Sequence, residues 1–170
     1  MLKSFSVSTL ILLCCALLES AILSNITVLP AVPDLSLLCV LYFSIQNGKI
    51  IGEGTGFISG IFIDFLSSGP FGVNCIVRTV VGYVGGLFNK TISTDGLFIP
   101  LMLGFTATIT KALVLLLVAL LYPTKVVAYN PFTSLFLFEL GCNTFLCPIV
   151  FKILSIFKNS INLKPESIVQ

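Results

Sequence analysis

The chain has 170 residues, of which 56% are hydrophobic and only 9% are charged. Soluble domains carry about a quarter charged residues, and a chain of this length cannot bury so much apolar surface in its own core. The composition therefore excludes a soluble globular protein. The net charge of +2 is uninformative, but no basic stretch outside the apolar runs is long enough to bind nucleic acid.

The apolar residues form six continuous runs, without the alternation of an outer-membrane barrel. Each run is predicted to be a membrane-spanning helix, which makes the chain a single all-α, polytopic membrane domain over residues 1–170. A span needs roughly 20 apolar residues. The second and third runs are near or below that length, so tilt or a re-entrant path stays open for them. The predicted spans are residues 4–24, 33–48, 50–66, 70–88, 97–122 and 131–157.

The lysine distribution predicts the orientation of these spans. Short cytoplasmic loops are enriched in Lys and Arg. If the N-terminus is internal, the inner loops and tails contain Lys3, Lys49, Lys90, Lys152, Lys158 and Lys164, and the outer loops contain only Lys125. We therefore expect both termini in the cytoplasm, as an even number of spans requires, and a multi-pass protein of the bacterial cytoplasmic membrane.

Glycines recur every four residues in two of the predicted spans. Side chains four apart lie along one ridge of a helix, and small ones let a neighbouring backbone approach closely in lipid. We predict that two such ridges pack against each other. The first consists of Gly48, Gly52, Gly56 and Gly60, with Asp64 at the next position. The second consists of Asn74, Arg78, Gly82 and Gly86.

Five ionisable residues lie inside the predicted spans, namely Glu19, Asp64, Arg78, Lys111 and Glu139. Such residues are costly in lipid and should have partners or face water. We predict an Asp64–Arg78 pair across the turn between the third and fourth spans, and a Lys111–Glu139 pair between the fifth and sixth. All five lie in the middle or outer half, which predicts either an outward-facing polar cavity or a polar seam for a partner helix. Fixing the register between helices would also explain them.

The residues offer little for catalysis or for a cofactor. The chain has no histidine, which excludes Ser–His and Cys–His nucleophile pairs and histidine-ligated metal sites. Its six cysteines lie in apolar runs without a CxxC pair and are interpreted as small hydrophobic side chains. An intramembrane aspartyl protease needs two deep aspartates, whereas only Asp64 is deep and Asp34 lies at a span edge. We expect no enzyme activity, cofactor or metal.

Several motifs together resemble the MreD family of bacterial rod shape-determining membrane proteins. They are Pro33-Asp34-Leu35, Gly52-x-x-x-Gly56-Phe57-x-x-Gly60-x-x-x-Asp64, Gly72 and Val81-Gly82-Tyr83. The similarity covers most of the chain. It implies a non-enzymatic component of the cell-elongation complex that scaffolds peptidoglycan synthesis with a single-span MreC-like protein. It also implies an MreB-like cytoskeleton, RodA and the transpeptidase partner of RodA as partners, and it brings no catalytic residues.

The architecture is also similar to the substrate-binding S components of energy-coupling-factor vitamin transporters. Such a subunit binds its substrate in an outward-facing pocket and docks through an Ala-x-x-x-Ala motif in its first span. Here that motif is present only in the degenerate form Ala16-x-x-x-Ser20. Because Glu19, Asp64 and Arg78 could line an outer pocket, the S-component function stays open as the alternative.

Overall fold

The computed structural model describes residues 2–26, 30–67, 69–89, 91–92, 94, 96–122 and 133–157, with the backbone alone for 2–4. Within these residues the chain forms six α-helices, in the order predicted from the six apolar runs. They are α1 (Leu2–Ala21), α2 (Leu35–Asn47), α3 (Lys49–Leu66), α4 (Val73–Leu87), α5 (Phe98–Leu121) and α6 (Ser134–Ile156), and a 3-10 turn at Leu23–Asn25 follows α1. Lys90, Lys125, Lys158, Lys164 and the side chain of Lys3, used above for the orientation, lie outside the described residues.

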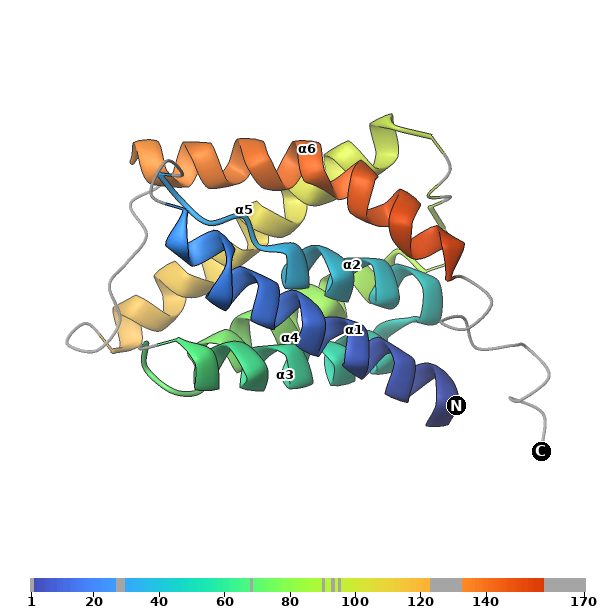
Figure 1. The fold of residues 1–170 in the computed structure, drawn as a ribbon, viewed down its shortest axis with the longest axis horizontal. Coiled ribbons are helices and arrows are strands. Elements are labelled where there is room, and N and C mark those ends of the chain that lie inside the picture. Colours follow the sequence, from blue (N-terminus) through green and yellow to red (C-terminus); the bar gives the residue numbers. More distant parts are fainter. Residues whose placement is uncertain are drawn as a thin grey trace.

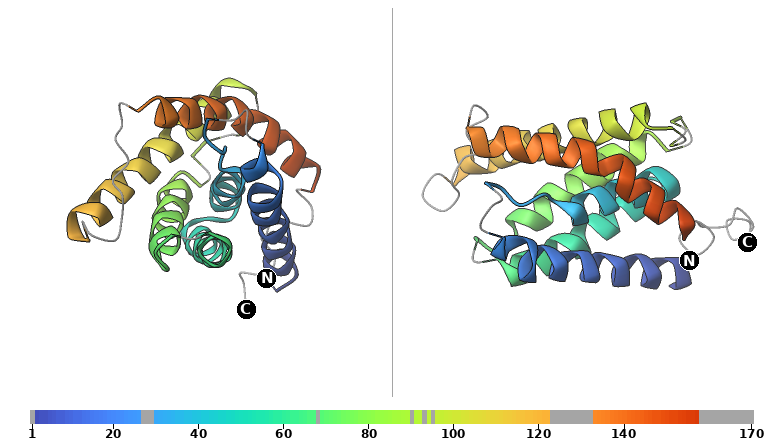
Figure 2. Two further views of the ribbon diagram at one scale, coloured as in Figure 1. Left: turned by 60° about the vertical axis from the view of Figure 1, so that its left-hand side comes forward. Right: turned by 45° about the horizontal axis from the view of Figure 1, so that its top comes forward.

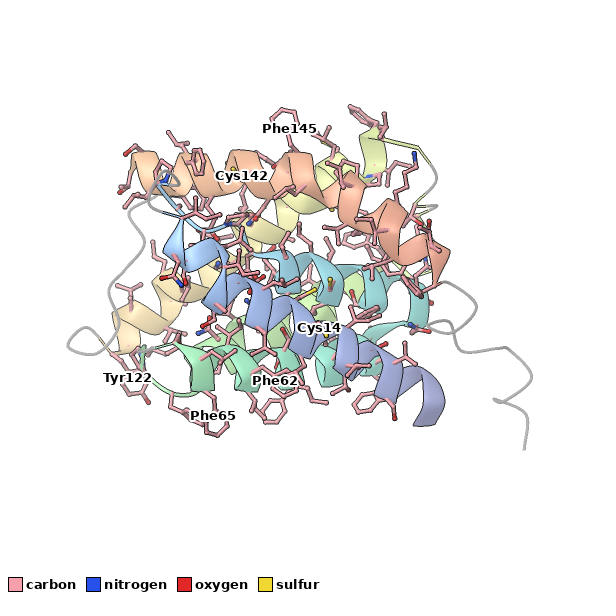
Figure 3. The ribbon with its side chains drawn as sticks, viewed as in Figure 1. Cys14, Phe62, Phe65, Tyr122, Cys142 and Phe145 are labelled. Carbon is pink, nitrogen blue, oxygen red and sulfur yellow. The ribbon has the colours of Figure 1, made fainter. Side chains whose placement is uncertain are left out.

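Three of the helical segments are long and apolar enough to cross a membrane: Phe5–Asn25, Phe98–Leu121 and Ser134–Ile156. The outer surface of the bundle is apolar: Figure 3 shows Phe145 of α6 and Phe65 of the shorter helix α3 pointing away from it, and both side chains are exposed. Such a surface suits lipid contact. The all-α membrane class is therefore confirmed, whereas six full crossings remain a prediction.

Helix α2 is the shortest helix of the described bundle and occupies its centre. Its 13 residues extend about 20 Å, less than the roughly 30 Å hydrocarbon core. Every residue from Ser36 to Ile45 is nevertheless buried. Figures 1 and 2 show α2 enclosed by the other helices. Because protein rather than lipid surrounds it, α2 does not need the length of a lipid-facing helix.

Helices α3 and α4 form a hairpin through the two predicted glycine ridges. A methyl group added at Gly52 would overlap the carbonyl oxygen of Gly82, and one added at Gly56 would overlap the carbonyl of Arg78. At Gly60 the same methyl group would overlap the backbone of Cys75. The backbones of α3 and α4 thus touch directly at glycines of the two ridges.

Gly48 departs from the helical ridge predicted for it. It lies between α2 and α3 with a φ of +91°, a backbone conformation that glycine tolerates and other residues rarely adopt. It therefore lets the chain leave α2 and begin α3 with no intervening loop. The backbone of Gly48 still contributes to the hairpin, because a methyl group at Gly86 would overlap the Gly48–Lys49 backbone.

Candidate functional site

A buried network of charged side chains joins four helices of the bundle. Arg78 of α4 lies 2.6 Å from Asp34, measured from Nη2 to Oδ1. Lys111 of α5 lies 2.8 Å from the second carboxylate oxygen of Asp34 and 2.6 Å from Oε1 of Glu139 in α6. The predicted Lys111–Glu139 pair is therefore present. The centre of the network, however, is Asp34, at the start of α2.

Asp34 is held in place by the backbone as well as by the two cations. It is the N-cap of α2, where its Oδ1 accepts a hydrogen bond from the Leu37 N–H at 3.0 Å. Its own N–H donates to the side-chain oxygen of Asn143 at 2.8 Å, and the Asn143 amide donates to Thr108 at 3.2 Å. Both oxygens of the buried carboxylate thus accept hydrogen bonds, two at Oδ1 and one at Oδ2, which offsets the cost of removing the charge from water.

Arg78 connects this carboxylate to α1 and α3. Its Nη1 donates to the hydroxyls of Ser36 at 2.5 Å and Ser59 at 3.0 Å. The Ser36 hydroxyl and backbone N–H in turn donate to the two carboxylate oxygens of Glu19, at 3.0 and 2.5 Å. Glu19 is only 7% exposed, so it belongs to the network.

The predicted Asp64–Arg78 pair is wrong. Asp64 instead accepts hydrogen bonds at the start of α4, from the N–H groups of Gly72 at 2.9 Å, Asn74 at 3.2 Å and Cys75 at 3.3 Å, and from the Asn74 side chain at 2.9 Å. The N-cap position of α4 is Gly72, which has no side chain, so a carboxylate from α3 satisfies these donors. The partial positive charge of the helix N-terminus also favours an anion there.

Replacing Asp64 with alanine is expected to destabilise the α3–α4 hairpin by about 2 kcal/mol, because the first turn of α4 loses its acceptors. Asp64→Asn keeps one acceptor oxygen and should be intermediate. The measurement is the free energy of unfolding in mixed micelles. An alanine variant as stable as the native chain would contradict the capping role.

A cavity of about 500 Å³ borders the network at the end of the bundle where α2 and α4 begin. Glu19, Asp34, Arg78 and Lys111 line it together with Asn74, whereas Asp64 does not. The charged lining residues are two acids and two bases, so their formal charges cancel. Lys111 has the most exposed of the paired charged side chains, at 15%. The cavity has the chemistry to accept a zwitterionic small molecule or a charged side chain of a partner.

Sequence reasoning identified Glu19, Arg78, Lys111 and Glu139 but missed Asp34 as their common partner. The available signal was its position: an aspartate between a proline and an apolar run is typical of a helix N-cap. That places the carboxylate at the N-terminal end of α2. In the described part of the chain no cluster of three or more His, Cys, Asp or Glu side chains could hold a metal ion.

The chain matches a known protein family. The family described as the rod shape-determining protein MreD matches residues 2–157, nearly the whole chain. The matched region contains every residue of the charge network and both glycine ridges. The comparisons with curated proteins and with solved structures each gave no match.

Proposed function

This chain belongs to the MreD family of rod shape-determining membrane proteins, and from that premise we propose that it is a non-enzymatic scaffold of the bacterial cell-elongation complex. The observation that carries the proposal is the family match over residues 2–157. In this proposal the chain lies in the cytoplasmic membrane and contributes a rigid surface, and the reactions of peptidoglycan synthesis belong to its partners.

We place six crossings in the membrane, with both termini in the cytoplasm. The described lysines support this orientation, because Lys49 begins α3 and Lys152 lies in the last turns of α6. Figure 1 shows that the start of α1 and the end of α6 lie at the same end of the bundle. A lysine-rich end is typical of the cytoplasmic side. The charge network and its cavity then lie toward the outside.

The charge network supports a structural role because its members are buried and paired with one another. Such pairs fix the register of helices that hydropathy alone leaves free to slide or rotate. We propose that the network holds α2, α4, α5 and α6 in one arrangement, which presents a docking surface to a single-span MreC-like protein. An MreB-like cytoskeleton, RodA and the transpeptidase partner of RodA are the further partners that the family suggests.

Depleting the protein from rod-shaped cells in rich medium is expected to widen and round them. The physical reason is that side-wall synthesis loses its membrane anchor and becomes scattered. Cell width and the incorporation of a fluorescent cell-wall precursor measure the effect, and re-expression of the native chain is the control. Depleted cells that keep their width and their pattern of wall synthesis would contradict the proposal.

The cavity of about 500 Å³ favours one alternative, a substrate-binding subunit similar to the S component of a vitamin transporter. Its polar lining, with Arg78 and Lys111 beside Glu19, suits a small ligand that carries both charges. The alternative predicts that a vitamin co-purifies with the chain and that depletion abolishes its uptake without changing cell width. Mass spectrometry of extracts from the purified protein distinguishes the two functions.

A further inference from the structure

A second cavity lies at the opposite end of the bundle from the charge network. Its volume is about 400 Å³, and it lies between the C-terminal half of α2, the start of α5 and the C-terminal half of α6. Tyr42, Leu97, Pro148, Lys152 and Ser155 are among the residues that line it. None of them belongs to the charge network, and the proposed scaffold function assigns them no role.

Tyr42 places an unsatisfied donor in the wall of this cavity. The residue is only 1% exposed, and in the described part of the chain its hydroxyl is the single buried side-chain polar atom without a hydrogen-bond partner. The ring is held edge-on by Phe43 and Phe151, with centroid distances of 6.2 and 5.1 Å. Leaving a buried hydroxyl unpaired costs free energy, so native proteins rarely do so without a reason. The Tyr42 hydroxyl can donate a hydrogen bond, so the group that would pair with it is a hydrogen-bond acceptor.

The electrostatics of the cavity favour an anionic acceptor. Lys152 is the single charged residue among the described residues that line it. Helix α5, with 24 residues, begins at the cavity, and its N-cap Leu97 has no side chain that could cap the first turn. The N–H groups at the start of α5 are those of Phe98 and Ile99, because Pro100 has none, and together with the positive end of the helix dipole they attract anions. Tyr42, Lys152 and the start of α5 thus all line one space.

We propose that this cavity binds the headgroup phosphate of an anionic phospholipid from the cytoplasmic leaflet. The rim of the cavity favours a lipid over a soluble phosphate. Leu97 in the lining is more than half exposed, and so is its chain neighbour Phe98. Two residues of α6 adjacent in sequence to lining residues, Ile153 and Ile156, are also more than half exposed, which provides apolar surface for acyl chains. Anionic lipids are typical of the cytoplasmic leaflet, and basic pockets between helices on that side recognise their headgroups. The proposal rests on the membrane orientation and does not require the role in cell elongation.

The first test measures thermal unfolding of the purified full-length chain in a neutral detergent. Adding phosphatidylglycerol is expected to raise the melting temperature with a saturable dependence, whereas phosphatidylcholine and inorganic phosphate should leave it unchanged. Lys152→Gln should weaken the apparent affinity for phosphatidylglycerol about fivefold. The matched control is Lys49→Gln, which removes an exposed lysine at the same end that does not line the cavity.

The second test uses Tyr42→Phe, for which the proposal predicts effects of opposite sign. Without anionic lipid the variant should melt at the same or a higher temperature, because it removes an unpaired buried hydroxyl. Its affinity for phosphatidylglycerol should fall about tenfold, because the phosphate loses a hydrogen bond. A merely structural hydroxyl would instead lower the melting temperature in neutral detergent and leave lipid affinity unchanged.

Three further results would overturn the proposal. Equal stabilisation by phosphatidylcholine and phosphatidylglycerol would show that the cavity does not distinguish lipids by the charge of their headgroup. Equal stabilisation by inorganic phosphate alone would assign the cavity to a soluble anion. Equal loss of affinity in Lys152→Gln and Lys49→Gln would place the effect in the general charge of this end of the bundle.

Discussion

Gly56→Leu is expected to prevent α3 and α4 from packing, with a loss of stability of at least about 3 kcal/mol and failure of the protein to accumulate in the membrane. A side chain at this position meets the carbonyl group of Arg78 and the Cα atom of Thr79. These are backbone atoms of a helix, so they cannot move aside as the end of a flexible side chain would. Forcing a side chain against backbone atoms therefore costs more than the roughly 1–3 kcal/mol that an oversized core residue usually costs. Membrane level and free energy of unfolding in mixed micelles are the measurements.

The chain offers a matched control on the same helix. Gly54 also lies inside α3, but a methyl group there would make only ordinary contacts with the Phe5 ring, the nearest at 3.5 Å. Gly54→Ala should therefore be neutral or stabilise α3 by up to about 1 kcal/mol, as helix propensity predicts. Gly56→Ala should already destabilise. If the two alanine variants had the same stability, the close packing of the glycine ridges would be refuted.

Arg78→Met is expected to cost about 3 kcal/mol, because it removes one of the two cations paired with the buried Asp34 carboxylate. It also removes the donor to the buried Ser36 and Ser59 hydroxyls. Asp34→Asn should be destabilising for the complementary reason, although the amide oxygen can still cap α2. The double variant should be less destabilised than the sum of the two, with a coupling energy of roughly 2 kcal/mol. A double-mutant cycle of unfolding free energies measures this coupling, and a value near zero would contradict the Asp34–Arg78 pair.

The matched control for this cycle is the pair that sequence reasoning favoured. Asp64→Asn combined with Arg78→Met should show additive effects, since Asp64 caps α4 and its hydrogen bonds do not involve Arg78. Strong coupling between these two positions, together with additivity at Asp34, would reverse the assignment of partners. The two cycles share the Arg78 variant, so any difference between them comes from the carboxylate alone.

The spacing of residues along the chain was enough to predict the helices and the contact between α3 and α4. Hydropathy runs and four-residue glycine spacing are local signals, and a helix converts them directly into a surface. The Lys111–Glu139 pair followed for a similar reason. Consecutive antiparallel helices place residues at matching depth, so sequence distance from the turn indicates which charges can meet.

The partners of Arg78 and Asp64 could not be predicted in this way. Arg78 has a carboxylate available on the preceding helix, at Asp64, and another at the start of α2, at Asp34. The choice depends on how α2 lies against α4 and on the N–H groups of the first turn of α4, which need hydrogen-bond acceptors. The spacing of residues along the chain indicates neither of these. The same holds for Ser36, Ser59 and Asn143, whose side chains complete the network from three different helices.

The sequence by itself determined the all-α membrane class, the six helices in their order, the glycine ridges and four of the five charged residues of the network, because each of these follows from composition or local periodicity. Only the tertiary structure decided that α2 is enclosed, that Asp34 joins two cations, and that a cavity lies at each end of the bundle. Those features depend on distances between helices that are far apart along the chain, and distances of that kind are set by packing in three dimensions.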